Sequence, residues 1–299
     1  MKHPEKWRET IDPFSLPYNH FTLNEVLGYP HAGNDVFQAN GIYNNQKVAV
    51  FIKAARQRGA DLKREIETIS QLGWSILPQI IDYDEEQALF VVTLAKDGER
   101  LSTILGDNAN HESWDYLYEY GQTLARLHQT VGEFPDVKDR IYFHIPAQEY
   151  LERKGLRFVY DFLITHQPKD VHRCFCHGDF HYANILWKEK HISAILDFEL
   201  SGMGNREFDM AWALIQRPGQ RFLNTSEEIE QFLDGYRSVA SFSMNHLKYY
   251  LVLIYSRFYD YGKHCDGYQN YVMDILCSLC QSINQDPGTS ESTVLSHSG

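Results

Sequence analysis

The sequence predicts an α+β fold whose character changes near residue 95. Short β-prone runs separated by turn residues occupy the first third of the chain, together with one helical pattern, whereas long helical patterns dominate after residue 100. With 299 residues, of which 43% are hydrophobic and 23% charged, the chain can bury a substantial core. We therefore expect an N-terminal lobe over residues 1–95, a mainly helical lobe over residues 96–285, and a disordered tail over residues 286–299.

The N-terminal lobe is expected to hold a five-stranded sheet and one helix. Asn44 and Asn45 mark a hairpin turn inside the sheet. Residues 61–72 carry apolar side chains at helical spacing, and Gly73 closes that helix. Gly98, in a polar cluster, indicates a hinge where the first lobe ends. The five predicted strands cover residues 21–27, 36–39, 47–53, 76–83 and 88–94.

Helices and one hairpin make up the rest of the expected fold. The hairpin joins residues 185–187 to residues 192–196, which are both apolar and β-prone. Asp209 opens a helix, since an acidic side chain is favourable near a helix N-terminus. Longer helical patterns cover residues 114–128, 146–166, 227–240, 245–261 and 268–283.

Charge and cysteine content exclude several classes of protein. The formal net charge of −12 argues against a nucleic-acid partner, which needs a basic surface, and is compatible with a cationic small molecule. No apolar stretch is long enough to span a bilayer, and residues 1–15 contain no signal-peptide core, so we expect a cytoplasmic protein without membrane contact. Of the five cysteines, Cys277 and Cys280 have no second pair to complete a zinc site and are expected to be buried, reduced thiols, and Cys174 and Cys176 are expected to fill the core.

Three polar side chains stand at the ends of the predicted hairpin: Asp179, Asn184 and Asp197. A buried hairpin has no need of two carboxylates and an amide at its rim, whereas a phosphoryl-transfer site does. One carboxylate, here Asp179, must orient the attacking hydroxyl. An amide oxygen and a second carboxylate, here Asn184 and Asp197, suit a Mg²⁺ ion that holds nucleotide phosphates. The spacing therefore predicts a catalytic loop followed by a magnesium site.

A known kinase pattern has a similar spacing. The protein-kinase catalytic loop runs His-Arg-Asp-x-x-x-x-Asn and is followed by Asp-Phe-Gly. Residues 177–184 have His-Gly-Asp-x-x-x-x-Asn, and residues 197–199 have Asp-Phe-Glu. This variant resembles the aminoglycoside phosphotransferase family, kinase-like enzymes of small molecules that include choline kinases. The resemblance extends from Phe21 to Asn284 and implies a two-lobed, protein-kinase-like fold.

A protein kinase itself is not expected. Eleven residues separate Asp197 from Asp209, too few for an activation segment that docks a peptide, and no Ala-Pro-Glu sequence follows.

The resemblance implies a nucleotide site in the N-terminal lobe. Lys53 ends a strand similar to the kinase Val-Ala-Ile-Lys strand, whose lysine contacts the α- and β-phosphates. A glutamate of the following helix pairs with that lysine. Glu65 is expected in this role, with Glu67 as the competitor. A flap over the phosphates is expected around Gly33, although its glycine pattern is incomplete. The backbone segment that would meet adenine consists of Thr93, Leu94 and Ala95.

Other positions near the catalytic segment take supporting roles by the same resemblance. His177 is expected to hold the loop through hydrogen bonds, and Asp209 to brace it from below. His181 stands where protein kinases have a lysine near the transferred phosphate, so it could donate a hydrogen bond there; the alternative is an ordinary surface histidine. Glu199 replaces the last glycine of Asp-Phe-Gly, a departure that choline-kinase-like relatives share.

Together these expectations describe a phosphotransferase that uses ATP or GTP and Mg²⁺ to phosphorylate a hydroxyl group of a small molecule. An aminoglycoside-type antibiotic is the first choice of acceptor, and such an activity would confer antibiotic resistance. Choline, ethanolamine or another small metabolite is the alternative. A nucleotide-binding module without catalytic activity is the alternative from another class, motivated by the incomplete glycine flap.

Overall fold

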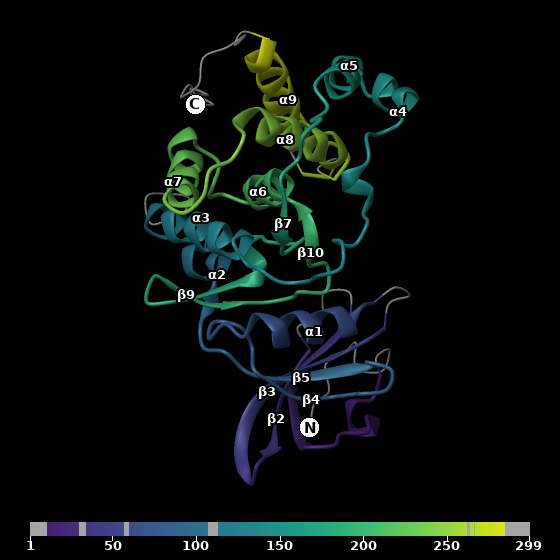
Figure 1. Cartoon of the computed structure of the whole chain (residues 1–299), viewed down its shortest axis with the longest axis vertical. Coiled ribbons are helices and arrows are strands. Elements are labelled where there is room, and N and C mark those ends of the chain that lie inside the picture. The colour runs from purple at the N-terminus through teal and green to yellow at the C-terminus, as the bar shows by residue number, and fades with distance from the viewer. Residues whose placement is uncertain are drawn as a thin grey trace. The chain divides into compact units, whose positions relative to one another are not determined.

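The computed structural model describes residues 11–29, 34–56, 60–106, 113–261, 264–265 and 267–284, without the side chains of residues 283 and 284. The described chain divides into two compact units (Figure 1). The first unit comprises the residues up to Glu99, with Asn184–Lys188 and Ile192–Ser201. The second comprises Arg100–Ala183, Glu189–His191 and the residues from Gly202 on. The predicted tail over residues 286–299 lies outside the described residues.

A five-stranded antiparallel sheet forms the first unit, as predicted (Figure 1). The turn between the second and third strands has φ of +50° at Asn44 and +62° at Asn45, the positive values that a tight hairpin turn needs. In spatial order the strands are β1 (Phe21–Gly28), β2 (Asp35–Tyr43), β3 (Gln46–Ala54), β5 (Phe90–Leu94) and β4 (Ile80–Tyr83).

One helix, α1 (Leu62–Leu72), packs on this sheet, also as predicted. The Asp61 side chain caps its first turn by accepting from the Arg64 amide, and Gly73 ends it with φ of +61°. Leu62 and Ile66 bury their side chains against Val91 of β5. The apolar stripe of α1 therefore fixes the rotation of the helix on the sheet.

A buried carboxylate anchors the start of the sheet. Asp82, on β4, is 2% exposed, and its Oδ2 atom accepts from the backbone amides of Asn19, His20 and Phe21 at 2.8–2.9 Å. Buried backbone donors need partners, so this one side chain satisfies three of them where β1 begins.

The predicted hairpin after the catalytic segment is present as β8 (Ile185–Lys188) and β9 (His191–Ile195). With β6 (Glu99–Arg100) these strands form a three-stranded sheet in the order β6-β8-β9. Gly98 precedes it with φ of +131°, and an added Cβ would lie 2.9 Å from the carbonyl oxygen of Trp187. Close backbone approach therefore requires glycine at this position.

The second unit is mainly helical, as predicted (Figure 1). A two-stranded sheet of β7 (Arg173–Cys176) and β10 (Gly202–Asn205) lies among its helices. Within the described residues of both units, short 3₁₀ turns cover Pro13–Ser15, Ile141–Phe143 and Tyr182–Asn184. The helices are α2 (Leu101–Leu105), α3 (Trp114–His128), α4 (Gln148–Arg153), α5 (Arg157–Thr165), α6 (Arg206–Leu214), α7 (Ser226–Arg237), α8 (Met244–Phe258) and α9 (Tyr268–Asn284).

Two helix predictions were wrong in detail. The helix predicted over residues 146–166 is two helices, α4 and α5, because Gly155 takes φ of +72° between them. Asp209 does not open a helix: α6 begins at Arg206, and the Asn205 side chain caps it by accepting from the Phe208 amide at 3.0 Å. Asp209 instead lies within the first turn of α6, near the N-terminus as expected, and its side chain is buried.

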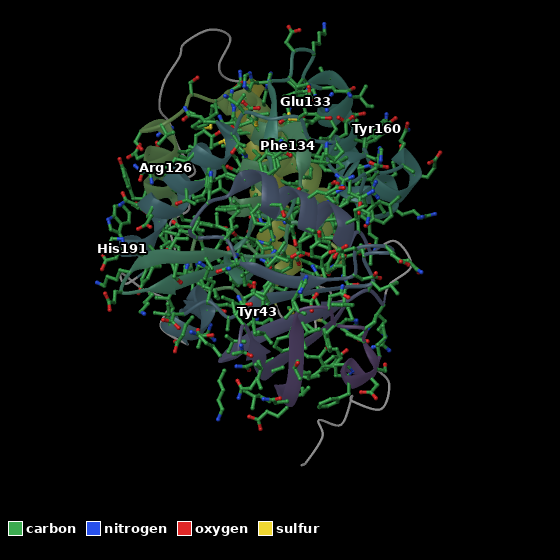
Figure 2. All side chains as sticks on the ribbon, turned by 60° about the horizontal axis from the view of Figure 1, so that its bottom comes forward. Tyr43, Arg126, Glu133, Phe134, Tyr160 and His191 are labelled. Atoms are coloured by element: carbon green, nitrogen blue, oxygen red, sulfur yellow. The ribbon has the colours of Figure 1, made fainter. Side chains whose placement is uncertain are left out.

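The cysteines form no disulfide. Cys174, Cys176 and Cys280 are buried as predicted, whereas Cys277 is only half-buried; Cys265 is exposed. Phe134, which Figure 2 labels, packs against Phe175 of β7 with ring centroids 4.4 Å apart. Among the residues described, no helix combines the length and apolarity needed to cross a bilayer.

Helices α3 and α7 approach so closely that their facing positions must be glycine. A Cβ added to Gly121 would overlap the carbonyl oxygen of Phe232, and one added to Gly235 would overlap that of Tyr118. The obstacles are backbone atoms, so a rotamer change cannot relieve them.

We predict that Gly121→Ala lowers the free energy of unfolding by about 1–3 kcal/mol, because the two helices must move apart to admit one methyl group. Arg126→Ala, an exposed change on the same helix, is the matched control and should have little effect. Urea denaturation of the two variants measures the difference. Equal stability of Gly121→Ala and the control would contradict the close packing of α3 on α7.

Candidate active site

Lys53, on β3, is surrounded by carboxylates from two other segments of the first unit. Its Nζ atom lies 2.7 Å from Glu65 of α1, 2.8 Å from Asp197 and 3.2 Å from Glu199. Burial opposes a charge on the ammonium, but the three carboxylates outweigh burial and raise the pKa of Lys53 above its ordinary value. The lysine therefore stays protonated and draws α1 and the segment after β9 together.

The structure places Glu65, and not Glu67, beside Lys53. Glu65 is 6% exposed, because it lies on the face of α1 that turns toward the sheet. The Glu67 side chain is 62% exposed and lies 3.8 Å from Lys63 on the same helix. The ambiguity left by the sequence is thereby resolved in favour of Glu65 as the lysine's partner.

Glu199 ties further segments to this cluster. Its Oε2 atom accepts from the Asn34 amide group at 2.7 Å, and its Oε1 atom accepts from the backbone amide of Asp61 at 3.3 Å. Carboxylate oxygens of Glu65, Asp197 and Glu199 lie within 4.8 Å of one another. Three acidic groups around one ammonium leave an excess of negative charge, which suits a divalent cation.

Asn184 immediately precedes β8 and Asp197 follows β9, so both lie at the same end of the hairpin. The backbone carbonyl of Asn184 accepts from the Leu196 amide at 2.8 Å, which brings the two predicted metal ligands next to each other along the paired strands. Asp197 has φ of +67°, a conformation that costs a non-glycine residue on the order of 1 kcal/mol. Its side chain is 39% exposed, so the carboxylate can be reached by a cation.

In the backbone segment expected to contact adenine, two amides already donate to carbonyl groups of the first unit. The Leu94 amide donates to Gln79, and the Ala95 amide donates to Ala49, both at 2.9 Å. Adenine contacts at Leu94 or Ala95 would therefore have to use carbonyl oxygens. Gly33, expected in the flap, lies outside the described residues.

In the second unit, Asp209 fixes the loop that carries Asp179. The two carboxylate oxygens of Asp209 accept from the backbone amides of His177 at 2.8 Å and Gly178 at 3.0 Å. Nε2 of His128 lies 3.2 Å from the same carboxylate, and its Nδ1 lies 2.7 Å from the Tyr236 hydroxyl. Asp209 is 1% exposed, so the loop is held by a buried acceptor with several donors.

The carboxylate of Asp179 has donors and positive charge around it. The indole Nε1 of Trp212 donates to Oδ1 at 2.7 Å, and an Arg140 nitrogen lies 3.7 Å from the same oxygen. Nε2 of His181 lies 3.6 Å from Oδ2. Burial alone would raise the pKa of Asp179, but His181, Arg140 and His177 outweigh burial and lower that pKa to about 2. Asp179 is therefore ionised at neutral pH.

Two histidines of the loop have defined tautomers in their neutral forms. Nδ1 of His177 accepts from the Asp179 amide at 3.2 Å, and Nδ1 of His181 accepts from the Ala183 amide at 3.2 Å. Each ring must then carry its proton on Nε2. For His181 that nitrogen is the one near Asp179, so this histidine is directed at the carboxylate and is not an ordinary surface residue.

Sequence reasoning missed Arg140 and Trp212. Arg140 lies in the loop before α4 and donates to the Gly178 carbonyl, and its guanidinium carbon is 4.4 Å from the centroid of the Trp212 ring. Nothing in the local sequence singles out this arginine. Trp212 did carry a signal, because it follows Asp209 by three residues and shares its helix face.

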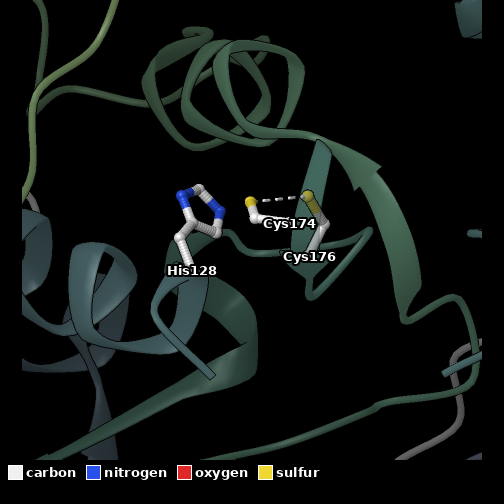
Figure 3. A group of neighbouring side chains, drawn as sticks. All are labelled: His128, Cys174 and Cys176. Carbon is white, nitrogen blue, oxygen red and sulfur yellow. Dashed lines mark hydrogen bonds between the residues drawn. The ribbon is translucent and has the colours of Figure 1, made fainter. Parts of the chain in front are cut away.

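His128, Cys174 and Cys176 form a second group of potential metal ligands (Figure 3). The two sulfur atoms are 3.8 Å apart on neighbouring same-face positions of β7. Both nitrogens of His128 already have hydrogen-bond partners, Asp209 and Tyr236. The group therefore packs and braces the loop, in agreement with the prediction of buried thiols.

Comparison with known proteins identifies relatives by fold and by family. A model of the phosphotransferase enzyme family matches residues 43–242. No curated protein matches the sequence. Among solved structures, the aminoglycoside phosphotransferase APH(4)-Ia is similar with a TM-score of 0.58 and 13% identity, over 87% of this chain and 94% of that one.

Two further solved structures are similar over most of their length. Amicoumacin kinase hAmiN, in complex with AMP-PNP and Ca²⁺, has a TM-score of 0.52 and 16% identity, with 90% of each chain covered. A choline/ethanolamine kinase family protein from Mesorhizobium loti has a TM-score of 0.53 and 15% identity, over 92% of this chain and 90% of that one. These likenesses confirm the kinase-like α+β fold predicted from the sequence.

We predict that Asp209→Asn destabilises the protein by about 1–3 kcal/mol, because the amide group turns a donor toward a backbone N–H that then loses its buried acceptor. Asp234→Asn, on the 56% exposed side chain of α7, is the control and should change stability little. Thermal unfolding of both variants checks the difference. A melting temperature of Asp209→Asn equal to that of the control would show that the loop does not depend on this carboxylate.

Proposed function

Because the chain belongs to the phosphotransferase enzyme family, we propose that it is a small-molecule kinase that transfers the γ-phosphoryl group of ATP or GTP to a hydroxyl group. The observation that carries this function is the Lys53 cluster, in which the lysine lies 2.7 Å from Glu65 and 2.8 Å from Asp197. A lysine held between a helix glutamate and the aspartate of an Asp-Phe-x motif is the arrangement that kinase phosphate sites use.

Lys53 binds the α- and β-phosphates in this function, and Glu65 holds the lysine in place. The protonated state of Lys53 supports this role, since the phosphates are anionic. Glu199, 3.2 Å from the ammonium, is a third anchor for the lysine.

Asn184 and Asp197 would bind a magnesium ion in this function. Asn184 offers a neutral oxygen and Asp197 a charged, partly exposed one, and Mg²⁺ prefers such hard oxygen ligands. The Leu196 amide donates to the Asn184 carbonyl, so Asn184 lies close to the backbone that leads into Asp197. A bound Mg²⁺ would neutralise charge on the phosphates during transfer.

Asp179 orients the acceptor hydroxyl. With a pKa lowered to about 2, its carboxylate is an acceptor and positioner at neutral pH and only a weak base. The hydroxyl oxygen forms a bond to the γ-phosphorus as the bond to the leaving nucleoside diphosphate breaks, and the hydroxyl proton leaves by way of this carboxylate.

An aminoglycoside-type antibiotic is the acceptor that we propose first, and choline, ethanolamine or another small metabolite is the alternative. Similar structures include an aminoglycoside phosphotransferase and an amicoumacin kinase, which favours an antibiotic, and a choline/ethanolamine kinase family protein, which favours the alternative. The identities of 13–16% leave the choice to experiment.

We predict that the wild-type protein hydrolyses ATP slowly in the presence of Mg²⁺ and stops when EDTA removes the metal. Asp179→Ala should lower this rate by about 10²-fold or more, because the attacking oxygen loses its positioner. Asp161→Asn, an exposed change in the same unit, is the matched control and should keep full activity. Phosphate release is the measurement. Absence of hydrolysis, with no acceptor in a broad panel, would favour a nucleotide-binding module without catalysis.

We predict that one class of hydroxyl compound stimulates ATP consumption above this basal rate. The panel should contain aminoglycosides, macrolides, choline, ethanolamine and simple sugars, each tested with ATP and with GTP. Coupled detection of ADP or GDP, followed by mass spectrometry of the acceptor, reads out a gain of one phosphoryl group. Stimulation by choline alone would remove the antibiotic as acceptor.

A further inference from the structure

Trp212 lies on α6, one turn after Asp209, and its indole is directed at the catalytic loop. The indole Nε1 atom is 2.7 Å from Oδ1 of Asp179, and the residue is 6% exposed. Residues three apart share a helix face, so one face of α6 serves the loop twice. Asp209 accepts from the loop backbone, and Trp212 donates to the carboxylate that the loop presents.

We propose that Trp212 is a positioning residue for phosphoryl transfer, because its indole N–H holds Oδ1 of Asp179 and thereby fixes the orientation in which this carboxylate meets the acceptor hydroxyl. This role depends on the proposed kinase function. Trp212 itself touches neither the hydroxyl nor the phosphate in this scheme and acts only through Asp179.

An indole is chemically suited to this task. Its N–H is a donor and never an acceptor, so it cannot take the hydroxyl proton in place of Asp179. It is also uncharged, and so it orients the carboxylate without neutralising it. A guanidinium or ammonium group at 2.7 Å would pair with the carboxylate and reduce its capacity to accept a proton.

The indole is held in place by cations and aromatic rings of the second unit. The guanidinium carbons of Arg140 and Arg217 lie 4.4 Å and 5.3 Å from the ring centroid, within the range of cation–π attraction. Arg217 is itself tied to the carbonyl oxygens of Trp212 and Ile215 at 3.3 Å. The Tyr142 ring packs edge-on against the indole at 4.9 Å. A donor fixed by so many contacts can hold a carboxylate in one orientation.

Kinetics of Trp212→Phe test this role, since phenylalanine keeps an aromatic ring and removes the N–H. We expect kcat for Mg·ATP hydrolysis to fall by about 10- to 100-fold, with KM for ATP unchanged, because the Lys53 cluster is untouched. Trp212→His, which restores a ring N–H, should recover part of the loss. Trp114→Phe replaces a 41% exposed tryptophan on α3 and is the control for the same chemical change.

Nuclear magnetic resonance of the indole N–H groups tests the hydrogen bond without reference to activity. The chain has five tryptophans, so few indole signals need assignment, and the one missing from Trp212→Phe belongs to Trp212. In Asp179→Asn this signal should shift more than any other indole signal, since its acceptor changes from a charged to a neutral oxygen. A Trp212 signal that does not move would show that the bond to Asp179 is absent and would overturn the role.

The outcomes separate this role from the function on which it depends. Wild-type protein without ATP hydrolysis or any acceptor would contradict the kinase function, whereas the indole shift could still be observed. An active wild type with Trp212→Phe equally active would overturn the role of Trp212 alone. If Trp212→Phe unfolds, Trp212→His carries the kinetic test: a kcat within about 10-fold of the wild-type value supports the N–H as the essential feature, and a larger loss in a folded protein contradicts it.

Discussion

The buried carboxylate of Asp209 is the constraint on which the candidate catalytic loop depends. The loop passes from β7 into the segment of Asp179, where consecutive amides at His177 and Gly178 have no strand to pair with. Asp209 accepts from both and meets His128 as well, so α6, α3 and the loop share one acceptor. Burying such a carboxylate costs free energy, which is offset only when its donors are in one arrangement around it. It therefore specifies the loop geometry more than it adds stability.

The side chains around Lys53 and those around Asp179 carry opposite charge. Lys53 has three carboxylates around it, and this excess of negative charge suits the cation and phosphate site that we propose there. Asp179 has the opposite surroundings, with Arg140 and His181 near its two oxygens. The lowered pKa of Asp179 follows from these neighbours. Each group thus receives the ionisation state that its proposed part in phosphoryl transfer requires.

Local patterns in the sequence predicted most of the fold. Asn44–Asn45 and Gly73 need no information beyond their neighbours, because turn and cap geometry is set within a few residues. The Asp179, Asn184 and Asp197 spacing likewise identified the candidate site, although their catalytic roles stay predictions. The break at Gly155 was missed because the apolar pattern continues across it. Arg140 was missed because its contact with Asp179 is made 39 residues away in the chain, which no local spacing encodes.

The three carboxylates around Lys53 lower the reactivity of its amine toward labelling reagents. An amine attacks an electrophile only through its free lone pair, and the raised pKa keeps this nitrogen protonated. Acylating reagents should therefore react first with open side chains such as Lys63, which is 75% exposed, and leave Lys53 intact. Covalent inhibitors aimed at this lysine would have to displace Glu65, Asp197 or Glu199 before a bond could form.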